Sequence, residues 1–282
     1  MNFSGYMIVT DLDGTFLARG GKEVERNTEA VRRFCEGGGL FTVATGRLHL
    51  NVRSALRDPT SLLNAPAIVS NGGYLYDFQK KETLLEDFID PEDARDLIAF
   101  IRRYCPDIPF RVATPYTVRA EALKGRIKQD VETYDPGTVE LISPAESWRM
   151  DDWYKLVFRE EPEVLAEVRR NFDAVFGDRL CAFASGVRFL EVQRPGCTKA
   201  AGILKLRKLL DSAGKRTVIA CGDFENDLAM LKEADVAVAP SGAIDLIKEV
   251  ADFVLCDCNE GLIADVVEGI ESGRIARGGV SI

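Results

Sequence analysis

The chain has 282 residues, of which 46% are hydrophobic and 29% charged, and its formal net charge is −9. This length and composition are ordinary for one large or two medium globular domains with ample core. The acidic balance excludes nucleic acid and anionic membranes as expected partners, since like charges repel.

Short apolar runs alternate with helical patterns along most of the chain. The runs are rich in Val, Ile and Phe and lack polar alternation, which is typical of strands buried on both faces. They predict strands at residues 6–10, 40–44, 67–70, 217–221, 236–239 and 253–255. Asn27 is expected to cap a helix that ends at Gly37, and residues 199–210 and 224–234 show further helical patterns. We therefore predict an α/β protein with a Rossmann-like parallel-sheet core and helices on both faces.

The middle of the chain breaks this rhythm, because its polar and aromatic content rises. Asp90 is predicted to cap a helix with Pro91 in its first turn. Residues 155–159 are predicted as a strand and 162–176 as a helix. The apolar residues expected on the buried face of that second helix are Leu165, Val168, Phe172 and Val175. Ser185-Gly186 is expected to form the turn of a hairpin.

These patterns predict two domains. Residues 79–193 are expected to form an inserted α/β cap domain, and residues 1–78 and 194–282 the core into which it is inserted. Substrate specificity is expected to reside in the cap.

Cysteine use and hydropathy indicate the compartment. The seven cysteines are scattered and odd in number, which favours reduced thiols. No apolar run is long enough to span a bilayer, and no basic-then-apolar segment lies at the N-terminus. We expect a cytoplasmic protein without a membrane partner, as a monomer or small homo-oligomer.

Polar residues follow four of the predicted strands. The four stretches are DLDGT at residues 11–15, ATGR at 44–47, SNGG at 70–73 and GDFEND at 222–227. In a parallel sheet, ligands bind beyond the carboxyl ends of the strands. One polar strand end means little, but four of them with several carboxylates imply a cation.

Phosphoryl transfer through an aspartyl-phosphate fits this collection of groups. An Asp carboxylate is ionised at neutral pH and attacks phosphorus without a base. It approaches an anionic ester only when charge is neutralised, which a hard ion such as Mg²⁺ does. A second carboxyl must protonate the leaving oxygen and then activate water. Asp11 and Asp13 can flank one phosphorus if the chain turns at Gly14.

Several of these residues also have simpler interpretations. A calcium loop is rejected, because its glycine belongs at the sixth position and Gly14 is at the fourth. Thr45 could be an ordinary strand-end hydroxyl, and Asp227 a residue of a first helical turn. Arg47 could bind substrate or pair with an acid, while His49, the single histidine, is expected to pack rather than catalyse. Lys199 begins a helix, where the dipole disfavours a cation, and this favours a functional role.

Taken in order, the motifs resemble those of the haloacid dehalogenase superfamily of phosphatases, and within it the Cof-type group with a large α/β cap. Residues 11–15 resemble the nucleophile motif, Thr45 the phosphate-binding hydroxyl, Lys199 the lysine of the third motif and residues 222–227 the metal motif. Residues 70–73 resemble the loop that precedes the cap in that group. The resemblance covers roughly residues 5–77 and 194–270, and in the cap only size and position match.

The resemblance implies a role for each matching residue. Asp11 would be the nucleophile and a metal ligand, and Asp13 the general acid/base, with its carbonyl at the metal. Asp223 would be the third protein ligand of Mg²⁺, and Asp227 would support the metal shell. The residues implied in substrate or phosphate binding are Leu12, Thr45, Gly46, Arg47, Asn71, Lys199 and Asn226. The chain departs from the group at Ala200, where the group often has glycine.

The function expected from this resemblance is Mg²⁺-dependent hydrolysis of small phosphorylated metabolites, such as sugar phosphates. A phosphomutase uses the same motifs, and a non-catalytic phosphosugar-binding protein is a further alternative. Such a binding protein would be expected to have lost Asp11 or Asp13, and a dehalogenase would lack Asp13 and Asp223.

Overall fold

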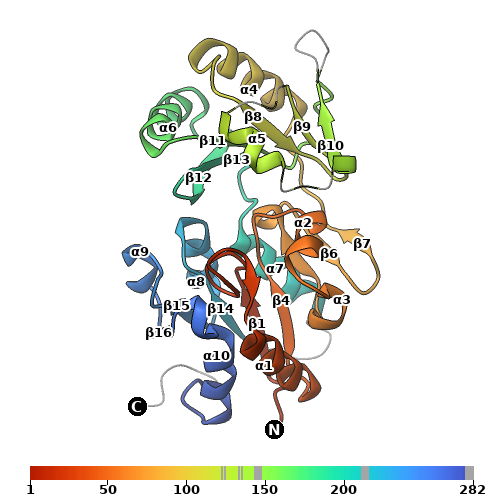
Figure 1. Cartoon of the computed structure of the whole chain (residues 1–282), viewed down its shortest axis with the longest axis vertical. Coiled ribbons are helices and arrows are strands. Elements are labelled where there is room, and N and C mark those ends of the chain that lie inside the picture. Colours follow the sequence, from red (N-terminus) through yellow and green to blue (C-terminus); the bar gives the residue numbers. More distant parts are fainter. Residues whose placement is uncertain are drawn as a thin grey trace. The chain divides into compact units, whose positions relative to one another are not determined.

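The computed structural model describes residues 1–121, 123, 125–132, 134, 136–142, 148–210 and 216–276. The chain divides into two compact units, drawn in Figure 1. The first unit joins Met1–Leu85 to Thr198–Ile282, and the second is Glu86–Cys197. The first unit extends past residue 78, because strand β7 (Glu82–Leu84) pairs with β6 (Tyr74–Asp77).

The first unit is built around parallel strands that alternate with helices. Its strands are β1 (Tyr6–Thr10), β2 (Leu17–Ala18), β3 (Lys22–Glu23), β4 (Leu40–Val43), β5 (Ala67–Val69), β6, β7, β14 (Thr217–Cys221), β15 (Val236–Pro240) and β16 (Phe253–Leu255). Its helices are α1 (Glu25–Glu36), α2 (His49–Ala55), α3 (Pro59–Leu62), α7 (Lys199–Leu210), α8 (Leu228–Glu233), α9 (Asp245–Lys248) and α10 (Leu262–Glu271). Short 3₁₀ turns η1 (Ser70–Gly72), η4 (Glu225–Asp227) and η5 (Cys258–Glu260) connect some of them.

A five-stranded parallel sheet with the order β16-β15-β14-β1-β4 forms the centre of this unit. On β1, Met7 and Val9 share a buried cluster with Ile203 of α7 and Met230 of α8. Ile8 lies between them and faces the other side of the sheet, since side chains alternate along a strand. The predicted α/β class with a parallel-sheet core is confirmed.

Two expectations for this unit are wrong. The strand predicted at residues 67–70 is not one of the strands of the parallel sheet. Among the described residues, β5 pairs antiparallel with β6 and meets the end of β4 at the isolated bridge Ala44–Ile68. Asn27 does not cap α1, which begins at Glu25. Asn27 is buried inside the helix, where it donates to the carbonyl of Phe16 at 2.8 Å and accepts from the Ala264 amide at 3.1 Å. Its amide is satisfied by distant backbone instead of by the helix end.

The second unit is a six-stranded mixed sheet with the order β10-β9-β8-β11-β13-β12. Its elements are α4 (Pro91–Tyr104), β8 (Phe110–Ala113), β9 (Val118–Ala120), α5 (Gly125–Val131), η2 (Pro136–Thr138), β10 (Val139–Leu141), β11 (Lys155–Arg159), α6 (Pro162–Phe176), β12 (Cys181–Gly186) and β13 (Phe189–Gln193). Leu97 of α4 and Phe172 of α6 share one buried cluster with Leu156 and Val192 of the sheet. Asp90 caps α4 as predicted, accepting from the Glu92 amide at 2.9 Å.

Two details of the second unit differ from the sequence prediction. Val175 is 45% exposed, and the next residue, Phe176, is buried in its place. The strand β12 continues through Ser185 and Gly186, so the hairpin turns at Val187-Arg188 instead. The buried apolar position of α6 thus lies one residue, and the hairpin turn two residues, after the predicted place.

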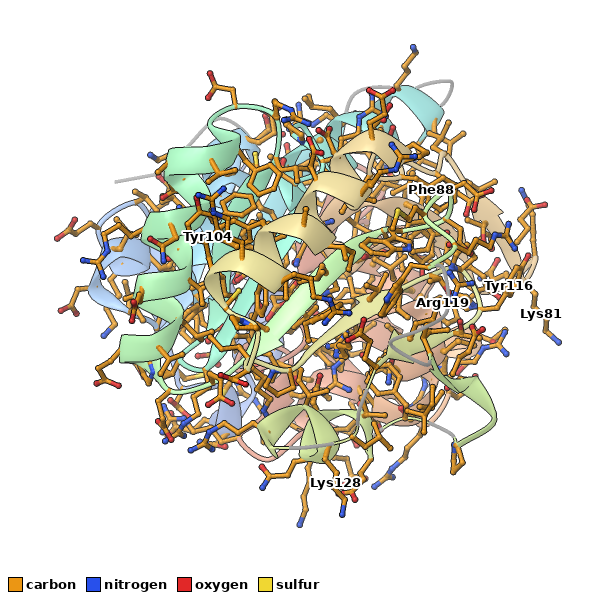
Figure 2. All side chains as sticks on the ribbon, turned by 90° about the horizontal axis from the view of Figure 1, so that it is seen from above. Lys81, Phe88, Tyr104, Tyr116, Arg119 and Lys128 are labelled. Carbon is orange, nitrogen blue, oxygen red and sulfur yellow. The ribbon has the colours of Figure 1, made fainter. Side chains whose placement is uncertain are left out.

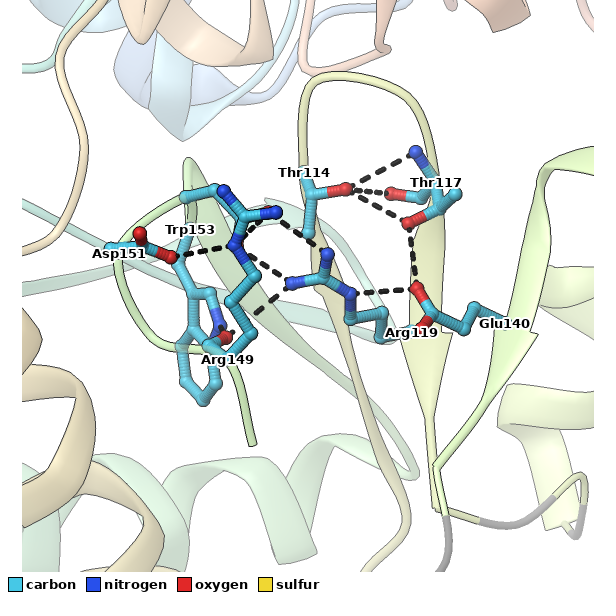
Figure 3. Close-up of polar contacts among 8 residues, drawn as sticks. Thr114, Thr117, Arg119, Glu140, Arg149, Asp151 and Trp153 are labelled. Carbon is cyan, nitrogen blue, oxygen red and sulfur yellow. Dashed lines mark hydrogen bonds and ion pairs between the residues drawn. The ribbon is translucent and has the colours of Figure 1, made fainter. Parts of the chain in front are cut away.

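A polar network stiffens the turn between β8 and β9 (Figure 3). The Thr114 hydroxyl bonds the Thr117 carbonyl at 2.8 Å, and Arg119 donates to Glu140 at 2.8 Å and to both carboxylate oxygens of Asp152. Tyr116 lies in this turn with 80% of its surface exposed, and Figure 2 shows it at the edge of the view. The turn therefore presents an exposed aromatic ring on a backbone that hydrogen bonds hold in place.

Within the residues that the structure describes, no helix has both the length and the apolar character needed to cross a membrane.

Candidate active site

The carboxyl ends of β1 and β14 bring the first and last motifs together. These strands pair in parallel from Tyr6 opposite Thr217 to Thr10 opposite Cys221. The Asp11 amide then donates to the Cys221 carbonyl at 2.8 Å. The residue after each strand thus begins a loop at the same sheet edge, which places Asp11 near Asp223.

Lys199 is the centre of the charged cluster at this edge. Its side chain is fully buried, and its Nζ lies 2.6 Å from Oδ1 of Asp11 and 2.6 Å from Oδ1 of Asp227. Burial alone lowers the pKa of Lys199, but the carboxylates of Asp11 and Asp227 outweigh it and raise that pKa above its ordinary value. Lys199 is therefore a cation that links the loop after β1 to the loop after β14.

The carboxylates in this cluster oppose one another. Burial raises the pKa of Asp11 well above its usual range; Lys199 opposes this, and the charges of Asp227 and Asp223 add to it. Burial, together with the charge of Asp227, raises the pKa of Asp223 to about 6. One lysine does not fully offset these repulsions, so the cluster is short of positive charge.

Asp227 organises the loop that contains Asp223. Its side chain is fully buried, and its Oδ2 accepts from the amides of Asp223 at 3.0 Å and Phe224 at 3.2 Å. Because Oδ1 accepts from Lys199, both oxygens of Asp227 have protein partners. The arrangement holds Asp223 and Lys199 in fixed positions relative to each other.

Thr15 and Gly14, in the loop after β1, both lie against the side chain of Asp223. The Thr15 hydroxyl donates to Oδ1 of Asp223 at 2.9 Å. Gly14 has a φ of +81°, and a Cβ there would lie 2.5 Å from Oδ2 of Asp223, so a side chain at this position is excluded. Thr15 lies within the nucleophile motif, but the sequence predicts no role for it. Its position directly after the turning glycine was the only available signal.

Arg47 pairs with an acid, which was one of its two predicted roles. Its Nε and Nη2 donate to the two carboxylate oxygens of Asp13 at 2.7 and 2.6 Å. The Asp13 side chain is 52% exposed, in contrast to buried Asp11. The two aspartates of the first motif thus face different surroundings, one buried beside Lys199 and one beside solvent.

The remaining predicted residues lie on neighbouring loops. Thr45 is buried, and its hydroxyl accepts from the Arg47 amide at 3.1 Å, with Gly46 between them. Asn226 donates to the side chain of Asn71 at 3.1 Å, so residues 70–73 and the metal motif are in contact. The side chain of Leu12 is fully buried, which leaves only its main chain able to meet a ligand.

The donor set suits a hard divalent cation. Carboxylate oxygens of Asp11, Asp223 and Asp227 lie within 4.8 Å of one another. Oxygen ligands of this kind are those preferred by Mg²⁺ and Ca²⁺. A divalent ion would also supply the positive charge that the raised pKa values of Asp11 and Asp223 indicate is missing.

Comparison with known proteins gives the family. A model of the haloacid dehalogenase-like hydrolases matches residues 8–267. The chain therefore belongs to the haloacid dehalogenase-like hydrolases, and the predicted Cof-type resemblance with an inserted α/β cap is confirmed.

Individual relatives cover nearly the whole chain. The 5-amino-6-(5-phospho-D-ribitylamino)uracil phosphatase YwtE of Bacillus subtilis is 26% identical, over 95% of this chain and 99% of its own length. The pyridoxal phosphate phosphatase YbhA of Escherichia coli is 25% identical, over 93% and 97%. The structure of a haloacid dehalogenase-like hydrolase from B. subtilis matches the fold with a TM-score of 0.80 at 23% identity, over 93% and 98%. The family and these phosphatases confirm the predicted enzyme class, a phosphoric monoester hydrolase.

Proposed function

We propose that this protein is a Mg²⁺-dependent phosphatase that hydrolyses small phosphorylated metabolites through an aspartyl-phosphate on Asp11. The observation that carries the proposal is the position of Lys199, which joins Asp11 to Asp227 at 2.6 Å each, beside Asp223. A buried carboxylate held by a lysine and surrounded by further carboxylates is suited to receive a phosphoryl group together with a cation.

In the first step, an oxygen of Asp11 attacks phosphorus and the bond from phosphorus to the ester oxygen breaks. The leaving oxygen takes a proton from the carboxyl group of Asp13. Asp13 suits this role because it is half exposed and two residues from the nucleophile, so it can reach an oxygen that departs towards solvent. When the carboxyl group holds that proton, one of its two hydrogen bonds from Arg47 is lost and the other, to the unprotonated oxygen, keeps the group in place.

In the second step, water attacks the phosphorus of the aspartyl-phosphate. The Asp13 carboxylate accepts a proton from that water, the bond from Asp11 to phosphorus breaks, and inorganic phosphate leaves. We assign the binding of the phosphoryl oxygens to Lys199, the Thr45 hydroxyl and the amides of Leu12 and Gly46, with Asn226 beside them. All of these lie on strand-end loops or at the start of α7.

The residues that would hold Mg²⁺ are Asp11, Asp223 and the backbone carbonyl of Asp13. When bound, the ion would lower the electrostatic cost of bringing an anionic ester to an anionic nucleophile. We place Asp227 behind these ligands, because both of its oxygens already accept hydrogen bonds from Lys199 and from backbone amides.

We propose phosphorylated sugars and sugar-like metabolites as the substrate class. The named relatives act on a phosphoribitylamino-uracil and on pyridoxal phosphate, both small monophosphates. We assign selection of the leaving group to the second unit, Glu86–Cys197. A cytoplasmic location and a monomeric or small oligomeric state remain proposals, to be tested by fractionation and gel filtration.

Phosphate release from a panel of phosphate esters tests this function. Purified enzyme should release phosphate with Mg²⁺, stop in EDTA and recover when Mg²⁺ is restored. Ca²⁺ should substitute poorly, because its longer bonds and looser geometry misplace the attacking oxygen. Full activity in EDTA, or transfer of the phosphoryl group between positions without release, would refute the proposal.

A further inference from the structure

A tyrosine of the β5-β6-β7 sheet holds the start of α2. The hydroxyl of buried Tyr74 accepts from the His49 amide at 3.0 Å and lies 3.0 Å from Nδ1 of the same residue. Tyr76, two residues along β6, stacks on the His49 ring with centroids 4.1 Å apart and planes at 14°. Two aromatic side chains on one face of β6 thus enclose the first residue of α2.

The His49 ring is neutral in these surroundings. Burial, helped by the charge of Arg53, lowers its pKa to about 4. A neutral ring packs between aromatic side chains without the desolvation cost of an imidazolium. The contacts of the His49 ring with Tyr74 and Tyr76 are therefore stable at neutral pH, and they agree with the packing role expected for His49.

The same short segment contains Arg47. Its amide donates to the Thr45 hydroxyl at 3.1 Å, and its carbonyl accepts from the Ser70 amide at 2.9 Å. His49, two residues further on, is fixed by Tyr74. The backbone of Arg47 is consequently held on both sides by buried groups.

The guanidinium group of Arg47 is partly exposed to solvent, unlike the groups that hold its backbone. The side chains of Arg47 and Asp13 are 32% and 52% exposed, so solvent and salt weaken the attraction between them. The two hydrogen bonds between these side chains act at the end of a flexible arginine side chain and do not by themselves fix the arginine backbone. The segment from which the guanidinium extends towards Asp13 is held at Thr45, at Ser70 and, through His49, at Tyr74.

We propose that Tyr74 is a positioning residue for the acid step: its hydroxyl fixes the start of α2, which aims Arg47, and Arg47 orients the carboxyl group of Asp13. This inference rests on the proposed function, in which Asp13 protonates the leaving oxygen. It assigns a role to a residue outside the recognised motifs, on a strand that the sequence did not predict.

The proposal has a kinetic signature. If the Asp13 carboxyl group is displaced, hydrolysis slows for esters whose leaving group needs a proton. Hydrolysis is little changed for esters whose leaving group departs as a stable anion. The value of kcat/KM reports steps up to formation of the aspartyl-phosphate, so only the acid role of Asp13 enters it. Phenyl phosphates with graded ring substituents vary this need at nearly constant shape.

The test compares Tyr74→Phe with Tyr76→Phe, because both remove one hydroxyl and keep the ring. The Tyr76 hydroxyl accepts from Arg53 at 3.2 Å and is the matched control. Tyr74→Phe should lower kcat/KM about 10-fold for phenyl phosphate and at most about 2-fold for 4-nitrophenyl phosphate. Tyr76→Phe should leave both values near wild type. In an Asp13→Ala background, Tyr74→Phe should cause no further loss.

A second variant removes the same hydrogen bond from the His49 side, together with the His49 ring and its contacts with Tyr74 and Tyr76. His49→Pro deletes the donating amide at the first helical position, where proline is tolerated, and Leu48 already has the extended backbone that proline requires before it. It should show the same dependence on the leaving group.

Three results would overturn the inference. They are equal losses for both esters in folded Tyr74→Phe, no loss in either variant, or a full additional loss in the Asp13→Ala background. Thermal unfolding establishes that each variant is folded. Wild-type enzyme that releases phosphate from neither ester would instead refute the proposed function itself, so the two failures are distinguishable.

Discussion

Lys199 is a buried cation with carboxylates as its two partners. A buried ion pair adds little net stability, because desolvation offsets the attraction, but removing one partner leaves an uncompensated charge. Here the partners left behind would be Asp11 and Asp227, which already repel each other. The position is therefore sensitive to any loss of the ammonium group.

Lys199→Met should abolish phosphate release and lower the free energy of unfolding by about 3–5 kcal/mol. Lys208→Met is the matched control, because Lys208 lies on the same helix with its side chain exposed. It should change stability by no more than about 0.5 kcal/mol. Chemical unfolding monitored by circular dichroism gives both values. Comparable stability of the two variants would contradict the role assigned to Lys199.

His49 predicts a defined dependence of stability on pH. Its pKa is lowered from 6.5 to about 4, mainly by burial, so the folded protein binds fewer protons than the unfolded chain between those values. Stability should therefore fall as pH drops from about 6.5 to about 4, by up to about 1.4 kcal/mol per pH unit, and this contribution should be constant below. His49→Gln should remove that part of the slope. Parallel unfolding profiles for the two proteins across this window would show that the ring is not buried as described.

At the scale of elements, the turn η1 holds three successive residues with positive φ: Ser70 at 51°, Asn71 at 53° and Gly72 at 92°. Such angles are costly for residues other than glycine, and they persist only where the surroundings fix them. The Ser70 amide bonds the Arg47 carbonyl, and the Asn71 amide bonds the Thr45 carbonyl, both at 2.9 Å. The strained turn thus connects residues 70–73 to the stretch at residues 44–47.

Gly72→Ala should damage both stability and activity. A Cβ there would lie 2.1 Å from the Thr198 carbonyl oxygen, directly before Lys199, so backbone must shift. Gly21→Ala is the control, because Gly21 has a φ of +76° with open space around it. Gly21→Ala should lower the free energy of unfolding by about 1–2 kcal/mol, from backbone strain alone. Gly72→Ala should lower it further and should also reduce kcat. Equal losses of stability in the two variants, with unchanged kcat, would mean that the contact with Thr198 is unimportant.

The sequence predicted the elements whose signal is local. Residues 6–10 and 217–221 are continuous apolar runs followed by acidic motifs, and both form strands of the parallel sheet at the predicted bounds. The prediction for β5 was wrong about its sheet, because an apolar run of this length does not reveal its pairing partner. The prediction that Asn27 caps α1 was wrong, because the hydrogen-bond partners of Asn27, Phe16 and Ala264, are distant in sequence.

The same difference between local patterns and distant contacts decides which residues of the candidate active site could be predicted. Asp11 and Asp223 were identified because they stand in recognisable motifs at strand ends. Tyr74 was not, because its hydroxyl acts on His49, 25 residues away, and a buried tyrosine in a short strand resembles any other core aromatic. Contacts between residues far apart in sequence leave no pattern in a single chain.

At the scale of the whole molecule, chemistry and specificity are assigned to different units. Tyr116→Ala alters an exposed ring on the β8–β9 turn of the second unit, and Tyr104→Ala alters a ring on α4 that is 43% exposed (Figure 2). Tyr116→Ala should change the ranking of kcat/KM among sugar phosphates while 4-nitrophenyl phosphate stays within about 2-fold of wild type. Tyr104→Ala should change neither, and Thr45→Ala should lower all esters by a similar factor. A uniform loss in folded Tyr116→Ala would contradict the proposed division of roles.

The central claim is that Asp11 carries the phosphoryl group during turnover. Rapid mixing of enzyme, Mg²⁺ and a good ester, followed by acid quench and peptide mass spectrometry, tests it directly. The account predicts that the peptide containing Asp11 gains the mass of one phosphoryl group, more so in Asp13→Ala, where the base for the second step is absent. A phosphoryl group found on another residue, or efficient turnover by Asp11→Asn, would contradict it.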